Sequence, residues 1–253
     1  MPTPSDTRTH ILDTAERLFA ARGIDAVGIR ALVDEAKVNL AAVHYHFGNR
    51  EELVRAVIKR RVLPMNAERL RRLDEVEAAA GGAPQLPDIL RAFVAPVFEL
   101  VDEQPHLGWL LAHIDVTPDE KLRMFFYSLF VELVWRFGAA LRKAVPQEIG
   151  DREGWTRVQF TWGAMLFTMA KRTDREVTAS GQIEPLPVAQ LIDEWVAFCT
   201  AGLTCESPAA NHAAHPARKN GRRATPVRTP PAKAEKQTTP QRRKSATKKR
   251  DPK

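Results

Sequence analysis

Hydrophobic positions recur at helical spacing along most of the chain, and Gly and Pro separate the segments that carry them. The first segment has a single apolar stripe, made of Ile11, Leu12, Ala15, Leu18 and Phe19. No segment keeps the period-two alternation that is typical of a strand. The pattern therefore predicts an all-α protein. We expect helices over residues 6–22, 29–36, 40–46, 50–78, 87–103, 106–115, 119–145, 152–174 and 187–204.

The segments group into three predicted parts. Residues 1–50 form a three-helix, helix-turn-helix domain, residues 51–206 form a larger helical domain, and residues 207–253 form a tail. Aromatic residues are absent from the tail, where Pro, Ala, Lys, Arg, Ser and Thr dominate. Such a segment cannot bury enough apolar surface to offset its ordering entropy, so we expect the tail to be disordered.

Charge and cysteine content narrow the class of protein. The chain has a formal net charge of +7, but the tail alone holds 14 Lys and Arg against two Asp and Glu, which is +12 and leaves −5 for the rest. Two cysteines, Cys199 and Cys205, make neither a disulfide framework nor a zinc site. The N-terminus has no signal-peptide pattern, and no window is long and apolar enough to span a bilayer. We expect a soluble, cytoplasmic protein with no membrane partner.

A crowded stretch, "NLAAVHYHFGNREEL", holds His44, Tyr45, His46 and Phe47 side by side. The two histidines are two residues apart, so on a helix they point about 200° away from each other and cannot chelate one ion. No Ser or Cys nucleophile lies nearby, and the chain has no glycine-rich phosphate loop. We therefore expect no metal, no cofactor and no catalytic residues, and the protein is not expected to be an enzyme.

The same stretch has one inward and one outward face when it is drawn as a helix. Val43 and Phe47 face inward together, and Ala41 and Tyr45 lie at the centre of the opposite face. Asn39 stands where a helix N-cap belongs. A helix this short is stable only when its neighbours brace it. With a preceding helix over 29–36 and a tight turn, the pattern predicts a helix-turn-helix whose second helix enters a DNA major groove.

The run "ILDTAERLFAARGIDAVGIRALVDEAKVNLAAVHYHFGNREELV", residues 11–54, resembles the N-terminal domain of TetR-type transcriptional regulators. The resemblance implies a homodimer that binds a palindromic operator in double-stranded DNA. The sequence departs from the family pattern at His44, where Tyr or Asn is usual, and at Lys37, where Gly is common. The residues that the resemblance places at DNA are Arg30, Asn39, Leu40, Ala41, Ala42, His44, Tyr45, His46 and Arg50.

The larger domain holds 15 of the 18 aromatic residues, and the segment over 121–141 is apolar on more than one face. This enrichment fits either a solid core or a cavity that binds a ligand. The family resemblance favours a small apolar effector, and a fatty acid or acyl-CoA fits the few polar groups. The candidate ligand-binding residues are Phe93, Val97, Trp109, His113, Met124, Phe126, Phe130, Val134 and Phe137, with Leu133 beside them.

The last two predicted helices carry apolar residues around much of their circumference, which fits burial against a second subunit as well as against the core. The basic tail is either a solubilising extension or a polycation that adds sequence-independent DNA affinity. In the second case, deletion of 207–253 should weaken binding to all DNA alike and flatten its salt dependence. Two other functions stay open: a nucleoid-type DNA binder driven by the tail, and a helical protein that sequesters a ligand.

Overall fold

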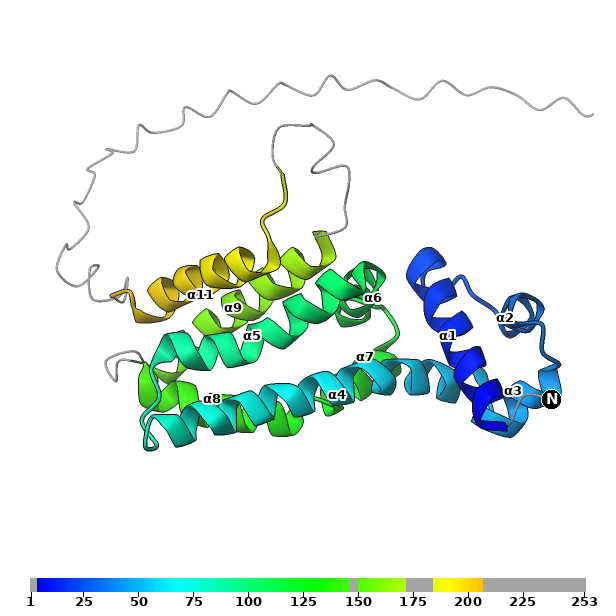
Figure 1. Cartoon of the computed structure of the whole chain (residues 1–253), viewed down its shortest axis with the longest axis horizontal. Coiled ribbons are helices and arrows are strands. Elements are labelled where there is room, and N and C mark those ends of the chain that lie inside the picture. Colours follow the sequence, from blue (N-terminus) through cyan, green and yellow to red (C-terminus); the bar gives the residue numbers. More distant parts are fainter. Residues whose placement is uncertain (1–3, 146–149, 172–183, 207–253) are drawn as a thin grey trace, which may run out of the picture. The chain divides into compact units, whose positions relative to one another are not determined.

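Ten helices and no strand make up the described part of the chain, residues 4–145, 150–171 and 184–206 of a computed structural model (Figure 1). The predicted all-α class is confirmed. The basic tail and residues 172–174, which were predicted to end a helix, lie outside the described residues. The helices are α1 (Pro4–Arg22), α2 (Ile29–Ala36), α3 (Leu40–Phe47), α4 (Arg50–Ala79), α5 (Leu86–Glu103), α6 (Pro105–Asp115), α7 (Glu120–Ser128), α8 (Val131–Ala144), α9 (Asp151–Lys171) and α11 (Val188–Thr204).

The first three helices pack on one another, α1 and α3 also contact α4, and their buried side chains belong to the same hydrophobic core as those of the later helices. The stripe predicted on α1 is buried, and Leu32 from α2 and Val43 from α3 meet it. Helix α3 is only eight residues long, so its stability comes from this packing.

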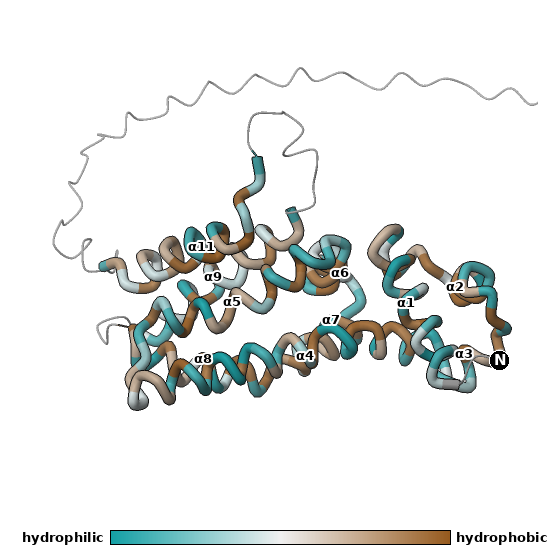
Figure 2. Tube along the Cα trace, viewed as in Figure 1, coloured by the Kyte–Doolittle hydropathy of each residue, from teal (hydrophilic) through white to brown (hydrophobic). Residues whose placement is uncertain are grey.

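Only two residues separate the end of α3 from the start of α4, which continues for 30 residues, about 45 Å at the rise of an α-helix. The Asn49 side chain accepts a hydrogen bond from the amide of Glu52 at 2.9 Å and so caps the N-terminus of α4. Pro64 lies inside α4, and Pro96 lies inside α5. Hydrophobic and hydrophilic residues alternate along α4 (Figure 2), because one side of it packs on α5, α7 and α8.

The single helix predicted over 119–145 is wrong, because the structure breaks it into α7 and α8, which are bent by 55°. The amides of Leu129 and Phe130 bond to carbonyls three residues back, so the last turn of α7 tightens. The Nδ2 of Asn66, a buried residue of α4, donates to the Leu129 carbonyl at 2.9 Å. The carbonyl freed by the break is thus satisfied from another helix. Neither Gly nor Pro lies at the break, so the sequence pattern predicts one continuous helix there.

The helices of the larger part pack closely at small residues. Helix α6 contacts α9, and Gly108 lies at the closest approach. A Cβ atom at Gly108 would lie 2.4 Å from the carbonyl oxygen of Met169, so only glycine fits there without a shift of the backbone. Helix α5 is buried along most of its length and packs on both α4 and α11.

Among the described helices, none alone has the length and apolarity to cross a bilayer, although the bent pair α7 and α8 reaches these limits when taken together.

Candidate DNA-binding surface and interior ligand site

The outer face of α3 is the candidate DNA-reading surface. The side chain of Tyr45 is 81% exposed, and Leu40, Ala41 and His44 are exposed beside it. Ala42 and His46 are half-buried at the edges of this face. Asn39 Oδ1 accepts a hydrogen bond from the Ala42 amide at 2.7 Å, so the predicted N-cap is confirmed. The helix therefore offers small apolar residues at its start and an aromatic, polar group one turn later.

His44 is oriented by the end of its own helix. Its Nδ1 lies 2.6 Å from the carbonyl oxygen of Gly48. A carbonyl can only accept, so Nδ1 carries the hydrogen and Nε2 is the ring nitrogen left for other partners. At the position where Tyr or Asn is usual, the His44 ring therefore binds the carbonyl of Gly48 at the C-terminal end of α3 and leaves Nε2 for another partner.

Lys37 ends α2 in the left-handed conformation, with φ of 51° and ψ of 40°. It is the only described non-glycine residue with positive φ. The turn geometry therefore matches the family pattern in which glycine is common, although the side chain here is lysine. The conformation costs about 1 kcal/mol, and it leaves an exposed cation between α2 and α3.

The two arginines predicted at DNA have different surroundings. Arg30 is exposed on α2. Arg50 is half-buried and donates from Nε to the Val27 carbonyl at 3.0 Å and from Nη2 to the Ile24 carbonyl. The guanidinium of Arg50 thus braces the loop between α1 and α2, and its contact with a phosphate stays a prediction.

A buried ion pair joins the helix-turn-helix part to the rest of the described chain. Glu16 of α1 accepts two hydrogen bonds from Arg61 of α4, both at 2.7 Å, and lies 3.3 Å from Nε2 of His106 in α6. The Glu16 side chain is 5% exposed. Burial alone would raise the pKa of Glu16, but the hydrogen bonds from Arg61 and His106 lower it below its usual value. Sequence analysis missed this carboxylate, although Glu16 interrupts the apolar face of α1.

A small apolar cavity lies between α4, α5, α6, α7 and α9. Its volume is about 20 Å³, which is room for one water molecule. Three predicted ligand-binding residues line it: Val97, Phe126 and Phe130. Sequence analysis missed the other lining residues, which are Val62, Met65, Arg69, Leu111, Trp162, Met165, Leu166 and Met169.

Several predicted ligand-binding residues lie elsewhere. Met124 is 59% exposed and Val134 is 51% exposed, so these two residues face outward from α7 and α8 and do not line the cavity. His113 is also exposed and stacks on Trp109, with ring centroids 3.8 Å apart. The Trp109 ring lies beside Gly23 at the end of α1, away from the cavity lining.

The remaining candidates border the cavity without lining it. Phe93 and Phe137 pack edge to face, with ring centroids 5.2 Å apart, and Phe93 also meets Trp162 of the cavity wall. Leu133 is buried in the same cluster. These side chains pack against the residues that line the cavity. They would contact a ligand only if the cavity enlarged.

Helices α9 and α11 bury one side and expose large apolar residues on the other. Met165, Met169, Ile192, Trp195 and Val196 are buried. The exposed members of the two helices are Trp155, Phe160, Phe167 and Phe198. The helices thus belong to the core and also carry an exposed apolar surface, and burial of that surface against a second subunit stays a prediction.

An exposed, capped second helix, followed by a long helix that leads into the larger helical part, is the architecture of a DNA-binding regulator of the helix-turn-helix class. Residues 11–57 match the family model of bacterial regulatory proteins of the tetR family, and residues 91–202 match that of the tetracyclin repressor-like C-terminal domain. The chain therefore belongs to the TetR family of transcriptional regulators.

Curated relatives agree with this assignment. The HTH-type transcriptional repressor Rv3405c of Mycobacterium tuberculosis is 32% identical over 165 residues, which cover 60% of this chain and 85% of that repressor. The nicotine-responsive repressor HdnoR of Paenarthrobacter nicotinovorans is 39% identical over 51 residues, 20% of this chain. For HdnoR and the next matches the chain spans about a quarter of the relative's length.

Solved structures share the fold at low identity. The fatty acid degradation regulator FadR of Bacillus halodurans aligns over 79% of this chain and 97% of its own, with a TM-score of 0.54 and 14% identity. A putative fatty acid metabolism regulator of Clostridium perfringens covers 78% of this chain and 100% of its own, with a TM-score of 0.58 and 17% identity. These likenesses support the all-α architecture of the described residues.

Proposed function

We propose that the protein is a dimeric repressor that leaves a palindromic operator when a small apolar effector binds inside the larger helical part. One observation carries the proposal. Helix α4 begins directly behind the reading helix α3, and the same helix contributes Val62, Met65 and Arg69 to the wall of the interior cavity. A ligand that rearranges this wall therefore acts on the helix that carries the reading surface.

The mechanism is a shift between two conformations of the dimer. Operator DNA favours the conformation whose two α3 helices match successive major grooves, and the effector favours another. The effector can act only through its different affinity for the two conformations. The exposed aromatic residues of α9 and α11 supply a surface of the kind that two-fold dimers bury.

A fatty acid or acyl-CoA is our proposed effector class. The cavity wall is almost wholly apolar, with Arg69 as its one charged member. The cavity is too small for such a ligand in this conformation, so any such ligand must enlarge it. The basic tail lies outside the described residues, and its added affinity for DNA stays a prediction.

The proposal is tested by fluorescence anisotropy of the full chain on the DNA upstream of its own gene, with excess unrelated competitor DNA. Arg30→Ala and Tyr45→Ala should each weaken binding about 10- to 100-fold, the cost of one lost base or phosphate contact. Arg91→Ala removes an exposed arginine of α5 and should leave affinity unchanged. A nucleoid-type binder would lose its DNA to the competitor, and a ligand-sequestering protein would show no preference for any fragment. Either result refutes the proposal.

A further inference from the structure

Arg69 is a buried cation without a carboxylate partner among the described residues. Its side chain is 0% exposed. Nη1 lies 3.5 Å from Asn66 Oδ1, Nη2 lies 3.3 Å from the sulfur of Met165, and the guanidinium carbon lies 4.4 Å from the centre of the Phe93 ring. A thioether is a weak acceptor, and 3.5 Å is at the outer limit of a hydrogen bond. The positive charge is therefore poorly compensated.

One edge of this guanidinium is almost without acceptors. Nε of Arg69 has no hydrogen-bond partner, and Nη2 has only the Met165 sulfur. Nε and Nη2 point their hydrogens in parallel, which is the geometry that binds both oxygens of a carboxylate. On the other edge, Nη1 has Asn66 Oδ1 at 3.5 Å, while Asn66 Nδ2 donates to the Leu129 carbonyl. The open edge belongs to a side chain that lines the cavity.

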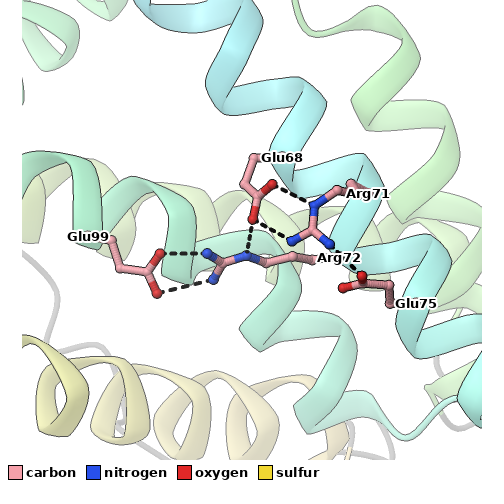
Figure 3. Close-up of polar contacts among 5 residues, drawn as sticks. All are labelled: Glu68, Arg71, Arg72, Glu75 and Glu99. Atoms are coloured by element: carbon pink, nitrogen blue, oxygen red, sulfur yellow. Dashed lines mark hydrogen bonds and ion pairs between the residues drawn. The ribbon is translucent and has the colours of Figure 1, made fainter.

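The neighbouring arginines of α4 show the contrast. Arg71 pairs with Glu68 and Glu75, and Arg72 pairs with Glu68 and Glu99 (Figure 3). The side chains in these pairs are 29–64% exposed, so water also solvates the charges. Arg69 is fully buried and pairs with none of these carboxylates.

Another buried arginine is fully supplied with acceptors. Arg157 of α9 donates to the carbonyls of Leu203 and Cys205 at 3.2 and 2.7 Å and to the carboxylate of Glu153 at 2.8 Å. Arg157, which holds α9 to the end of α11, thus has hydrogen-bond acceptors for its buried guanidinium. The unsatisfied edge of Arg69 is the exception, and it belongs to a side chain that lines the cavity.

We propose that Arg69 binds the carboxylate of the effector, so that the effector is a free carboxylic acid with an apolar body. This inference rests on the proposed function and narrows it. A carboxylate supplies the missing charge and two acceptors at once. The apolar body would meet Val97, Phe126 and Phe130. An acyl-CoA has a thioester where the acid has its carboxylate, so it does not fit this edge.

Protonation and packing are compatible with such a ligand. Burial lowers the pKa of Arg69 to about 9, so the guanidinium is still charged at neutral pH. Met65, Met165 and Met169 line the cavity. Their unbranched, flexible side chains can move aside more readily than branched ones. Entry of an acid beside Arg69 must displace them, and the displacement acts directly on α4.

The test compares matched acids and alcohols on the full-length protein by calorimetric titration. The probes are decanoate against 1-decanol and 2-naphthoate against 2-naphthol. At least one acid should bind about tenfold or more tightly than its alcohol, as expected for a charge-assisted pair. In Arg69→Met the preference for the acid should disappear while the alcohol still binds. In the control Arg72→Met, which removes a partly exposed guanidinium of the same helix that does not line the cavity, the preference should persist.

Three results would overturn the inference: equal binding of both acids and their alcohols, no binding of either acid, or an acid preference that survives in Arg69→Met. Stabilisation by chloride alone that vanishes in Arg69→Met would show a small-anion site and would also overturn it. If Arg69→Met does not fold, Arg69→Lys retains the charge without the parallel donors, and it should still weaken acid binding about tenfold. Operator binding is measured separately, so release by an alcohol alone would refute the role of Arg69 and leave the repressor proposal standing.

Discussion

The ion pair between Glu16 and Arg61 should be worth more than any exposed pair of the described chain, because it is buried where α1 meets α4 and α6. Glu16→Gln removes the charge and keeps the shape. Loss of one partner of a fully buried pair costs about 3–5 kcal/mol. The Arg61 side chain is 22% exposed and can recover some hydration. We therefore expect a loss of about 2–3 kcal/mol in the free energy of unfolding.

The assay is urea denaturation of the wild type, Glu16→Gln, Arg61→Gln and the double variant. The coupling energy from this cycle should be about 2 kcal/mol, within the range for directly contacting residues. Glu35→Gln is the control. It removes a carboxylate paired with Arg17 at 2.8 Å, but both side chains are largely exposed, so it should cost less than about 1 kcal/mol.

The pH dependence of these unfolding free energies gives a second test of the ion pair. The folded state lowers the pKa of Glu16 below its usual value of 4.5. The stabilisation is therefore present above about pH 4.5 and is lost as the pH falls through the folded pKa. The difference between wild type and Glu16→Gln should shrink in acid. A coupling energy under about 0.5 kcal/mol, or a difference that grows in acid, would refute the reasoning.

Four further variants test particular features of the fold. Lys37→Gly should raise the free energy of unfolding by up to about 1 kcal/mol in urea denaturation, because it removes the left-handed strain; a loss would contradict this. Gly108→Ala should lower it by about 3 kcal/mol, because its Cβ would meet the Met169 carbonyl, and no change would show that the helices can separate. Asn39→Ala should cost about 1 kcal/mol through the lost cap, measured by the same method. Phe160→Glu should shift the protein from dimer to monomer in analytical ultracentrifugation, and an unchanged dimer would place the interface elsewhere.

The sequence predicted the DNA-reading part in detail because short-range patterns determine it. The cap at Asn39, the inward pair Val43 and Phe47 and the exposed Tyr45 all follow from spacing along one helix. These features need no knowledge of which helices meet. The turn at Lys37 was also open to prediction, since the family pattern has glycine at that position.

The interior site was predicted less well because it depends on contacts between distant helices. The break at Leu129 is stabilised by Asn66, 63 residues away, and no local signal marks it. Once α7 and α8 bend, Met124 and Val134 turn outward. Arg69 did have a signal: it occupies a position on the apolar stripe of α4, between Met65 and Leu73. A charged residue at a core position of a helix needs a partner, which is another side chain for Glu16 and, in our proposal, a ligand for Arg69.

The small volume of the cavity has a consequence for how fast the proposed sensor responds. A volume of about 20 Å³ admits no acid or alcohol of the sizes considered, so capture must wait until the cavity enlarges. Association should then be slower than diffusion allows, because binding that requires a conformational change is slowed by it. Escape requires the same enlargement, so the complex should be long-lived. A regulator built in this way averages the supply of its effector over time and ignores brief pulses.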